Sequence, residues 1–229
     1  MKSLPVLYVD NHLLVVAKPA CLPIVPDESQ DVSLFDQAKA WIKQEYNKPG
    51  DVFLGVVHRL DRPVSGVVVF ARTSKAAKRL HASWQQPGAV RKWYLAASAA
   101  PWPNGLEEAG TWRQWLWKDR QRNRVIVSRQ DGSREAVTNY QRLPMTSAGS
   151  ALCLEAVTGR SHQLRVACAQ AGMPLLGDLK YGAQEPLKDK SIGLHAWRLE
   201  LPHPTRDEVM QFHAEPPTWA SSMSPLPDR

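Results

Sequence analysis

Short β-prone segments separated by turns occupy much of the chain and limit the folds that it can adopt. Few helical segments lie between them, so repeated strand–helix–strand units of a parallel sheet are not expected. The segments with strand-like patterns are Val6–Val9, Leu13–Ala17, Gly55–Val57, Val67–Phe70, Lys92–Ala97, Thr111–Trp117, Ala136–Leu143, Ala151–Ala156, Leu194–Leu201 and Glu208–His213. The pattern predicts an α+β fold with a mixed, largely antiparallel β-sheet and flanking helices.

Three segments space their apolar residues as an amphipathic helix does: Val32–Tyr46, Lys75–Trp84 and His162–Gln170. Thr73 and Ser74 form a plausible cap at the start of the second. We expect one domain over residues 1–220, followed by a loosely ordered tail at residues 221–229 that contains two prolines.

The charge balance is basic, with 29 lysines and arginines against 22 acidic residues and a formal charge of +7. Such an excess favours polyanions, of which nucleic acid is the usual one, although a merely basic surface would give the same count. The 3 cysteines form no C-x-x-C pair, which indicates thiols in a reducing compartment. Without an apolar leader or an 18-residue apolar run, a cytoplasmic protein with no membrane partner is expected.

A charged cluster lies between two valine runs in V-V-H-R-L-D-R-P-V-S-G-V-V-V-F-A, Val56 to Ala71. Burying Asp61 would be costly unless it were paired, and Arg59 and Arg62 flank it. Pairing with arginine keeps a carboxylate ionised, and an ionised, fixed aspartate can act as a covalent nucleophile. From this segment alone, an ordinary buried salt bridge at a strand end is the better explanation.

A second cluster combines T-G-R-S-H-Q-L-R-V, Thr158 to Val166, with L-L-G-D-L-K-Y-G, Leu175 to Gly182. If the chain turns helical from Ser161, Arg165 shares a face with Ser161 and His162. Two clusters of arginine, histidine and aspartate in one short chain indicate a single site.

Between the two clusters, R-K-W-Y-L-A places Lys92 and Tyr94 on one face of a strand and Trp93 on the other. A strand tyrosine usually belongs to the core. Beside a basic cleft, its ring could instead stack on a base.

At this point the chain resembles the RluA-type pseudouridine synthases. The resemblance is carried by six pieces in the family's order: K-P-A-C-L-P-I-V-P (Lys18 to Pro26), H-R-L-D-R-P-V-S-G (His58 to Gly66), K-W-Y-L-A (Lys92 to Ala96), G-R-S-H-Q-L-R-V (Gly159 to Val166), L-G-D-L-K-Y-G (Leu176 to Gly182) and L-H-A (Leu194 to Ala196). It implies the catalytic fold of that family over residues 1–220, with a catalytic cleft across the sheet.

The resemblance implies that Asp61 attacks a target uridine in RNA, whose base is cut from the sugar, turned and rejoined through C5. It also implies that Arg165 pairs with this aspartate, that Tyr94 contacts the base and assists proton removal, and that Arg59 fills the space left by the flipped nucleotide. The expected substrate-binding residues are Arg59, Arg62, Lys92, Arg160, His162, Gln163 and Leu194. An isomerisation of this kind requires neither metal nor cofactor, and the expected partner of this monomer is tRNA or rRNA.

Two rival functions would use parts of the same pattern. A catalytically silent RNA-binding or RNA-folding protein could keep the fold, but binding alone would not require Asp61, Tyr94 and Arg165 together. A metal-dependent hydrolase using His58 and Asp61 would need further ligands that the sequence does not supply.

The chain departs from the family pattern at two positions. It has Cys21 where the family usually has glycine, and Ala167 where the family usually has histidine. The catalytic pattern also begins almost at Met1, whereas many family members carry an N-terminal S4-type RNA-binding module. Grip on RNA is therefore expected from basic side chains of the catalytic domain: Lys75, Lys78, Arg79, Arg91, Lys92, Arg120, Arg122 and Arg124.

Overall fold

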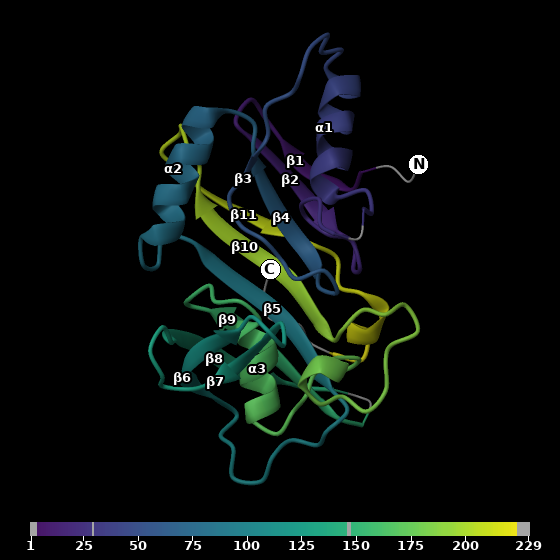
Figure 1. Cartoon of the computed structure of the whole chain (residues 1–229), viewed down its shortest axis with the longest axis vertical. Helices are drawn as coiled ribbons and strands as arrows, with labels where there is room; N and C mark the ends of the chain where they lie inside the picture. The colour runs from purple at the N-terminus through teal and green to yellow at the C-terminus, as the bar shows by residue number, and fades with distance from the viewer. Residues whose placement is uncertain (1–3, 29, 146–147, 224–229) are drawn as a thin grey trace. The chain divides into compact units, whose positions relative to one another are not determined.

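The computed structural model describes residues 4–28, 30–145 and 148–223 (Figure 1). Its strands are β1 Val6–Val9, β2 Leu13–Lys18, β3 Gly55–Val56, β4 Ser65–Ala71, β5 Arg91–Ser98, β6 Ala109–Asp119, β7 Arg124–Val127, β8 Arg134–Leu143, β9 Ser150–Ala156, β10 Leu194–Pro202 and β11 Val209–His213. Its helices are α1 Leu34–Glu45, α2 Ser74–Gln85 and α3 Gln163–Gln170, with 3₁₀ turns η1 Leu179–Tyr181 and η2 Thr218–Ala220. The chain forms two compact units: the first unit is Met1–Val90 with Ala196–Glu215, and the second unit is Arg91–His195 with Pro216–Arg229.

The first unit is built on the β1–β2 hairpin and on β4, which pairs antiparallel with β2 and β3. Asp10 sets the hairpin turn, because its Oδ1 atom accepts hydrogen bonds from the backbone N–H groups of His12 and Leu13, both at 2.7 Å. Strand β10 lies next to β4 and pairs antiparallel with β11.

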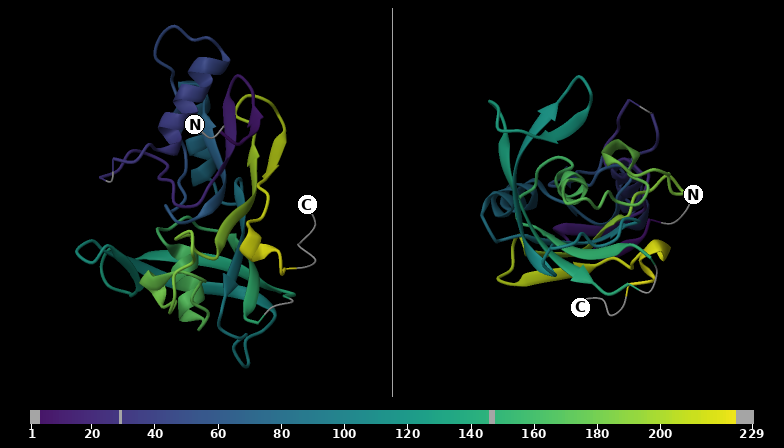
Figure 2. Two further views of the ribbon diagram at one scale, coloured as in Figure 1. Left: turned by 90° about the vertical axis from the view of Figure 1, so that its right-hand side faces the viewer. Right: turned by 90° about the horizontal axis from the view of Figure 1, so that it is seen from below.

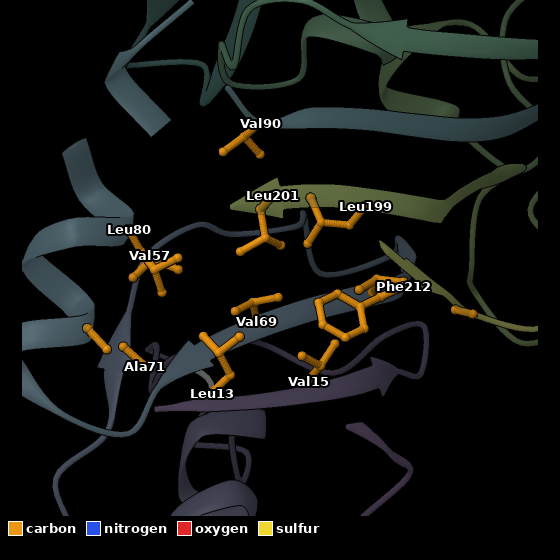
Figure 3. Close-up of a cluster of buried hydrophobic side chains, with 13 residues drawn as sticks. Leu13, Val15, Val57, Val69, Ala71, Leu80, Val90, Leu199, Leu201 and Phe212 are labelled. Carbon is orange, nitrogen blue, oxygen red and sulfur yellow. The ribbon is translucent and has the colours of Figure 1, made fainter. Parts of the chain in front are cut away.

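Both faces of β2 and β4 are buried, which explains their almost unbroken valine and leucine runs. One face carries Leu13, Val15 and Val69 and packs with Leu80 of α2 and Phe212 of β11, as Figure 3 shows. Helix α1 covers the opposite face, where the rings of Phe35 and Phe70 meet with centroids 6.3 Å apart.

Each of these two helices begins at a side-chain cap. Ser33 and Asp36 form a capping box at the start of α1, and Thr73 accepts a hydrogen bond from the Ala76 N–H at the start of α2. The predicted cap at Thr73 is therefore confirmed.

The second unit is an antiparallel sheet in the order β5-β9-β8-β6-β7. One face of this sheet presents Leu116, Val125 and Ala136, which pack against Val166 of α3 and Tyr181 of η1. Helix α3 and the segment from Leu175 to Gly182 therefore share one side of the sheet.

The predicted α+β class with a mixed sheet and few helices is correct. Strand β7 was not predicted, because three of its four residues are exposed and the residues before it look like a plain basic loop. Of the expected tail, residues 221–223 are described, and residues 224–229 lie outside the described residues. In the part of the chain that the structure describes, no helix is long and apolar enough to cross a membrane.

Candidate active site

Asp61 lies in the loop that joins β3 to β4 in the first unit. Leu60 and Val64 are 8% and 2% exposed, so the loop is anchored in the core on both sides of the acid. The Val64 N–H donates to the Asp61 carbonyl oxygen at 3.0 Å and closes a turn. The Asp61 residue is half-buried. The loop thus holds a partly desolvated carboxylate on a fixed backbone.

Lys18 is buried at the end of β2, with 1% of its surface exposed. Its Nζ atom donates to the carbonyl oxygens of Pro19, Leu22 and Arg62 at 3.0, 2.8 and 3.0 Å. An ammonium group has three N–H bonds, so these acceptors satisfy it completely. Lys18 therefore ties the segment after β2 to the loop that carries Asp61.

Gly66, just after this loop, has a φ of +122°. A side chain here would collide with the backbone of Ala196 in β10. Only glycine combines this φ with so close an approach of two strands.

The charged or titratable residues next to Asp61 in the sequence, His58, Arg59 and Arg62, differ in their exposure and in the groups to which they bind. Arg59 is exposed, whereas Arg62 pairs with Asp31 and, at 3.6 Å, with Asp27. His58 is used structurally, since its Nε2 atom accepts a hydrogen bond from the Val69 N–H at 2.9 Å. The ring of His58 also stacks on Trp84 with centroids 4.9 Å apart. Among the described residues, no group of three or more His, Cys, Asp or Glu is arranged to hold a metal ion.

Cys21 has a left-handed backbone, with a φ of 63°. This conformation explains why glycine suits the position in the family that the chain resembles. A non-glycine residue with this backbone is uncommon and costs about 1 kcal/mol or more.

Burial lowers the pKa of Lys18 from 10.5 to about 7, against the opposing influence of Cys21 and Asp61. The folded protein therefore binds fewer protons than the unfolded chain between these two values. We expect the free energy of unfolding to rise with pH from 7 toward 10, by up to about 1.4 kcal/mol per pH unit from this one group. Urea unfolding of the protein and of Lys18→Met at several pH values tests this. The prediction fails if the variant, which lacks the titrating group, keeps the same slope.

In the second unit, Tyr94 lies on the face of the sheet that α3 covers. It is directly opposite Leu154 in β9, which is opposite Tyr140 in β8. Thr138, two residues from Tyr140 along β8, accepts a hydrogen bond from the Gln163 side chain of α3. Since directly paired residues share a face and the side-chain period is 2, Tyr94, Thr138 and α3 are on one side.

Gln163 is buried and uses its whole amide within the second unit. Its Nε2 atom donates to the Val137 carbonyl oxygen at 2.9 Å and to Thr138 Oγ1 at 3.0 Å. Its Oε1 atom accepts from Thr158 Oγ1 at 2.7 Å and from the Arg160 N–H at 3.0 Å. Its predicted contact with substrate stays a prediction, whereas these bonds fix the loop that precedes α3.

The expectation that Arg165 shares a helical face with Ser161 and His162 is wrong, because α3 begins only at Gln163. His162 is its N-cap residue and has a left-handed backbone with a φ of 51°. Strained conformations of this kind persist where the surroundings enforce them. Here the His162 Nδ1 atom is hydrogen-bonded to Tyr181 Oη at 2.7 Å.

Arg165 forms a bidentate ion pair with Asp178. Its Nε and Nη2 atoms donate to the two carboxylate oxygens of Asp178, each at 2.7 Å. The two side chains are 8% and 1% exposed, and the guanidinium carbon lies 5.0 Å from the centre of the Tyr181 ring. A planar guanidinium held by two parallel hydrogen bonds has a fixed orientation as well as a fixed position.

Lys92 and Arg160 bring positive charge to this side of the second unit. Burial lowers the pKa of Lys92, and the charge of Arg160 lowers it further. The Arg160 Nε atom donates to the Glu135 carbonyl oxygen at 2.9 Å, which fixes its side chain. Leu194, at the start of β10, is 4% exposed and belongs to the core.

The structure thus distributes the predicted site residues over both units. Arg59, Asp61 and Arg62 follow one another in the first unit. The second unit contains the others: Lys92, Tyr94, Arg160, His162, Gln163, Arg165 and Leu194. The pairing of Arg165 with Asp61 stays a prediction.

Sequence reasoning gave no role to Lys18, Asp178 and Tyr181. Each lies inside a motif that was noticed, and each is buried with polar partners. In the sequence, Lys18 stands at the end of an apolar strand and Asp178 follows Gly177. These positions suggest buried charges, but they do not identify the groups to which the two side chains bind.

Comparison with known proteins adds independent information. The family model described as RNA pseudouridylate synthase matches residues 12–170. The chain is 33% identical over 216 residues to the dual-specificity RNA pseudouridine synthase RluA of Haemophilus influenzae, covering 93% of both chains. It is 32% identical over 228 residues to the ribosomal large subunit pseudouridine synthase D of Xanthomonas campestris pv. campestris, of which it covers 66%.

The solved structure titled human RNA Pseudouridylate Synthase Domain Containing 1 is similar with a TM-score of 0.76 and 25% identity, over 99% of this chain and 91% of that one. The family match covers more than half of the residues, and it includes the loop with Asp61, the strand with Tyr94 and the whole of α3. The resemblance seen in the motifs is therefore confirmed, and the chain belongs to the RNA pseudouridylate synthase family.

Proposed function

We propose that this protein isomerises specific uridines in structured RNA to pseudouridine, with Asp61 as the nucleophile. The observation that carries the proposal is the loop between β3 and β4, within the family match. It fixes a half-buried carboxylate between buried Leu60 and Val64 and is tied down by Lys18. A positioned carboxylate of this kind suits covalent catalysis.

In the proposed reaction, the Asp61 carboxylate attacks the uridine as the bond between the base and the sugar breaks. The base then turns and rejoins the sugar through C5, while the bond between Asp61 and the nucleotide breaks and frees the carboxylate. The proton that leaves C5 is matched by one taken up at N1. Tyr94 contacts the base and assists the proton removal, while Arg165 stabilises the aspartate as an anion. Atoms and oxidation state balance within one nucleotide, so the reaction needs neither a redox cofactor nor a metal.

The uridine must leave its stack to reach the carboxylate, at a cost of a few kcal/mol. Arg59, which is exposed beside Asp61, fills the space left in the RNA. Basic side chains on α2 and on the loop from Arg120 to Arg124 contact phosphates, in keeping with the formal charge of +7. The relative named for the ribosomal large subunit supports rRNA as a substrate. We extend the proposal to tRNA, and to a protein that acts as a monomer in the cytoplasm.

The proposal is tested with unmodified transcripts of large-subunit rRNA and of a tRNA pool. The purified protein is incubated with each transcript without added metal, and pseudouridine is mapped by a chemical adduct that stops reverse transcription. We expect stoichiometric conversion at one or a few uridines. Tight RNA binding with no conversion in any transcript would favour the silent RNA-binding protein instead.

A further inference from the structure

Tyr181 is buried in the second unit, with 6% of its surface exposed, and its hydroxyl joins three segments. The oxygen accepts a hydrogen bond from the Val125 N–H of β7 at 2.9 Å and is bonded to His162 Nδ1 at 2.7 Å. Tyr181 itself belongs to η1, three residues after Asp178. One phenol therefore fixes β7, the start of α3 and the acid that grips Arg165.

Two guanidinium groups lie near the Tyr181 ring. That of Arg165 is 5.0 Å from the ring centre, and that of Arg124 in β7 is 5.2 Å from it. Both distances fall within the range of cation–π attraction. The ring therefore contacts both a buried arginine of the candidate site and an exposed arginine at the start of β7.

Arg124 belongs to a hairpin formed by β6 and β7, whose tip is residues 120–123 and which projects from the rest of the second unit's sheet (Figure 2). The exposed cations on this hairpin are Lys118, Arg120, Arg122 and Arg124. A residue of η1 also holds the tip of this hairpin, since Lys180 Nζ donates a hydrogen bond to the Asn123 carbonyl oxygen at 2.8 Å. Its charge is complementary to RNA phosphates.

We propose that Tyr181 is a positioning residue that couples RNA phosphate contact at the β6–β7 hairpin to the orientation of Arg165; this rests on the proposed function. The coupling path has only short steps. A phosphate that draws the hairpin arginines moves β7, and the Val125 N–H transmits the movement to the Tyr181 hydroxyl. The Tyr181 ring contacts the Arg165 guanidinium, so a movement of Tyr181 reaches Arg165 directly. Tyr181 also lies in η1, which begins at the residue after Asp178, so its movement reaches the partner of Arg165 as well. RNA that engages the hairpin correctly therefore improves the geometry of Arg165.

The test is a double-variant cycle with Tyr181→Phe, which keeps the ring and removes the hydroxyl, and Arg122→Ala at the hairpin tip. Tyr181→Phe should lower kcat about tenfold with KM within about twofold, because it disturbs positioning more than binding. Arg122→Ala should raise KM about fivefold and lower kcat about threefold. In the double variant kcat should fall no further than in Tyr181→Phe, since the path is already broken.

Matched controls are Tyr140→Phe, another buried tyrosine of the second unit, and Arg129→Ala, an exposed arginine beyond β7. Both should leave kcat unchanged. If Tyr181→Phe fails to fold, Lys180→Ala loosens the same hairpin from the surface and should lower kcat in the same direction. Additive kcat losses in the double variant, or a wild-type kcat in both Tyr181→Phe and Lys180→Ala, would overturn the coupling.

A spectroscopic measurement separates this inference from the proposed function. The Arg165 Nε–H resonance is followed by ¹⁵N NMR while a uridine-free RNA hairpin is added, so that no turnover is needed. The signal should shift in the wild type and stay in place in Tyr181→Phe. Equal shifts in both proteins, or no shift in the wild type, would refute the coupling. A wild-type protein that shows the shift but forms no pseudouridine would refute only the proposed activity.

Discussion

Asp61→Asn should lower the rate of pseudouridine formation by at least about a thousandfold, because a neutral amide is a poor nucleophile at the sugar or base. The substitution is nearly isosteric, so the loop between β3 and β4 should keep its shape. RNA affinity should therefore stay within about threefold of the wild type, since phosphate contacts supply most of it. Single-turnover pseudouridine formation and filter binding on the same transcript measure the two quantities.

The matched control is Asp51→Asn, which removes a carboxylate from the same unit. Asp51 has an 88% exposed side chain and pairs with Lys39 at 2.8 Å. Its loss should leave the rate unchanged, because exposed ion pairs contribute little. Measurable turnover by Asp61→Asn, at more than a few per cent of the wild-type rate, would exclude this residue as the nucleophile.

Arg165→Met should lower the free energy of unfolding by about 3–5 kcal/mol, because it leaves the buried Asp178 carboxylate without its partner. Replacing both members, in Arg165→Met/Asp178→Leu, should restore most of this stability, since an apolar pair of similar volume tolerates burial. Activity should nevertheless stay at least about a hundredfold below wild type in the double variant, because the oriented guanidinium is gone. Urea unfolding and single-turnover kinetics give both quantities for each variant.

Arg113→Met serves as the control for this pair. Arg113 lies 3.6 Å from Glu135, with side chains 68% and 47% exposed, so its loss should change the free energy of unfolding by less than about 1 kcal/mol. If the stable double variant is as active as the wild type, Arg165 is only a structural partner of Asp178. A double variant as unstable as the single one would show that the site does not tolerate apolar packing.

Much of the fold follows from local patterns. The runs that begin at Leu13 and Val67 are almost entirely apolar, as expected of strands that are buried on both faces, so β2 and β4 could be placed from the sequence. The cap at Thr73 marks the start of a helix, so α2 could be placed as well. Strand β7 could not, because its single buried residue, Val125, depends on Tyr181 for its hydrogen bond. Such a strand is defined by its partner and not by its own pattern.

The candidate site was predictable in its residue types and less so in its connections. Asp61 and Arg165 stand out because charged residues in apolar surroundings require partners. Which partner each one takes depends on residues distant in sequence, as the contact of Lys18 with the Arg62 carbonyl oxygen shows. The predicted helix His162–Gln170 was found with its start one residue later, at Gln163, because His162 has a left-handed backbone that its surroundings set and that its residue type does not signal.

The close passage of Gly66 beside Ala196 limits how β4 can move against β10. With no space for even a methyl group there, β4 cannot slide along β10 by a residue without bringing a side chain into the crossing. The C-terminal end of the loop that contains Asp61 is therefore fixed relative to β10. Movement of Asp61 within its own unit is therefore expected from rotation of the backbone between Val57 and Val64, and not from a shift of β4 along β10.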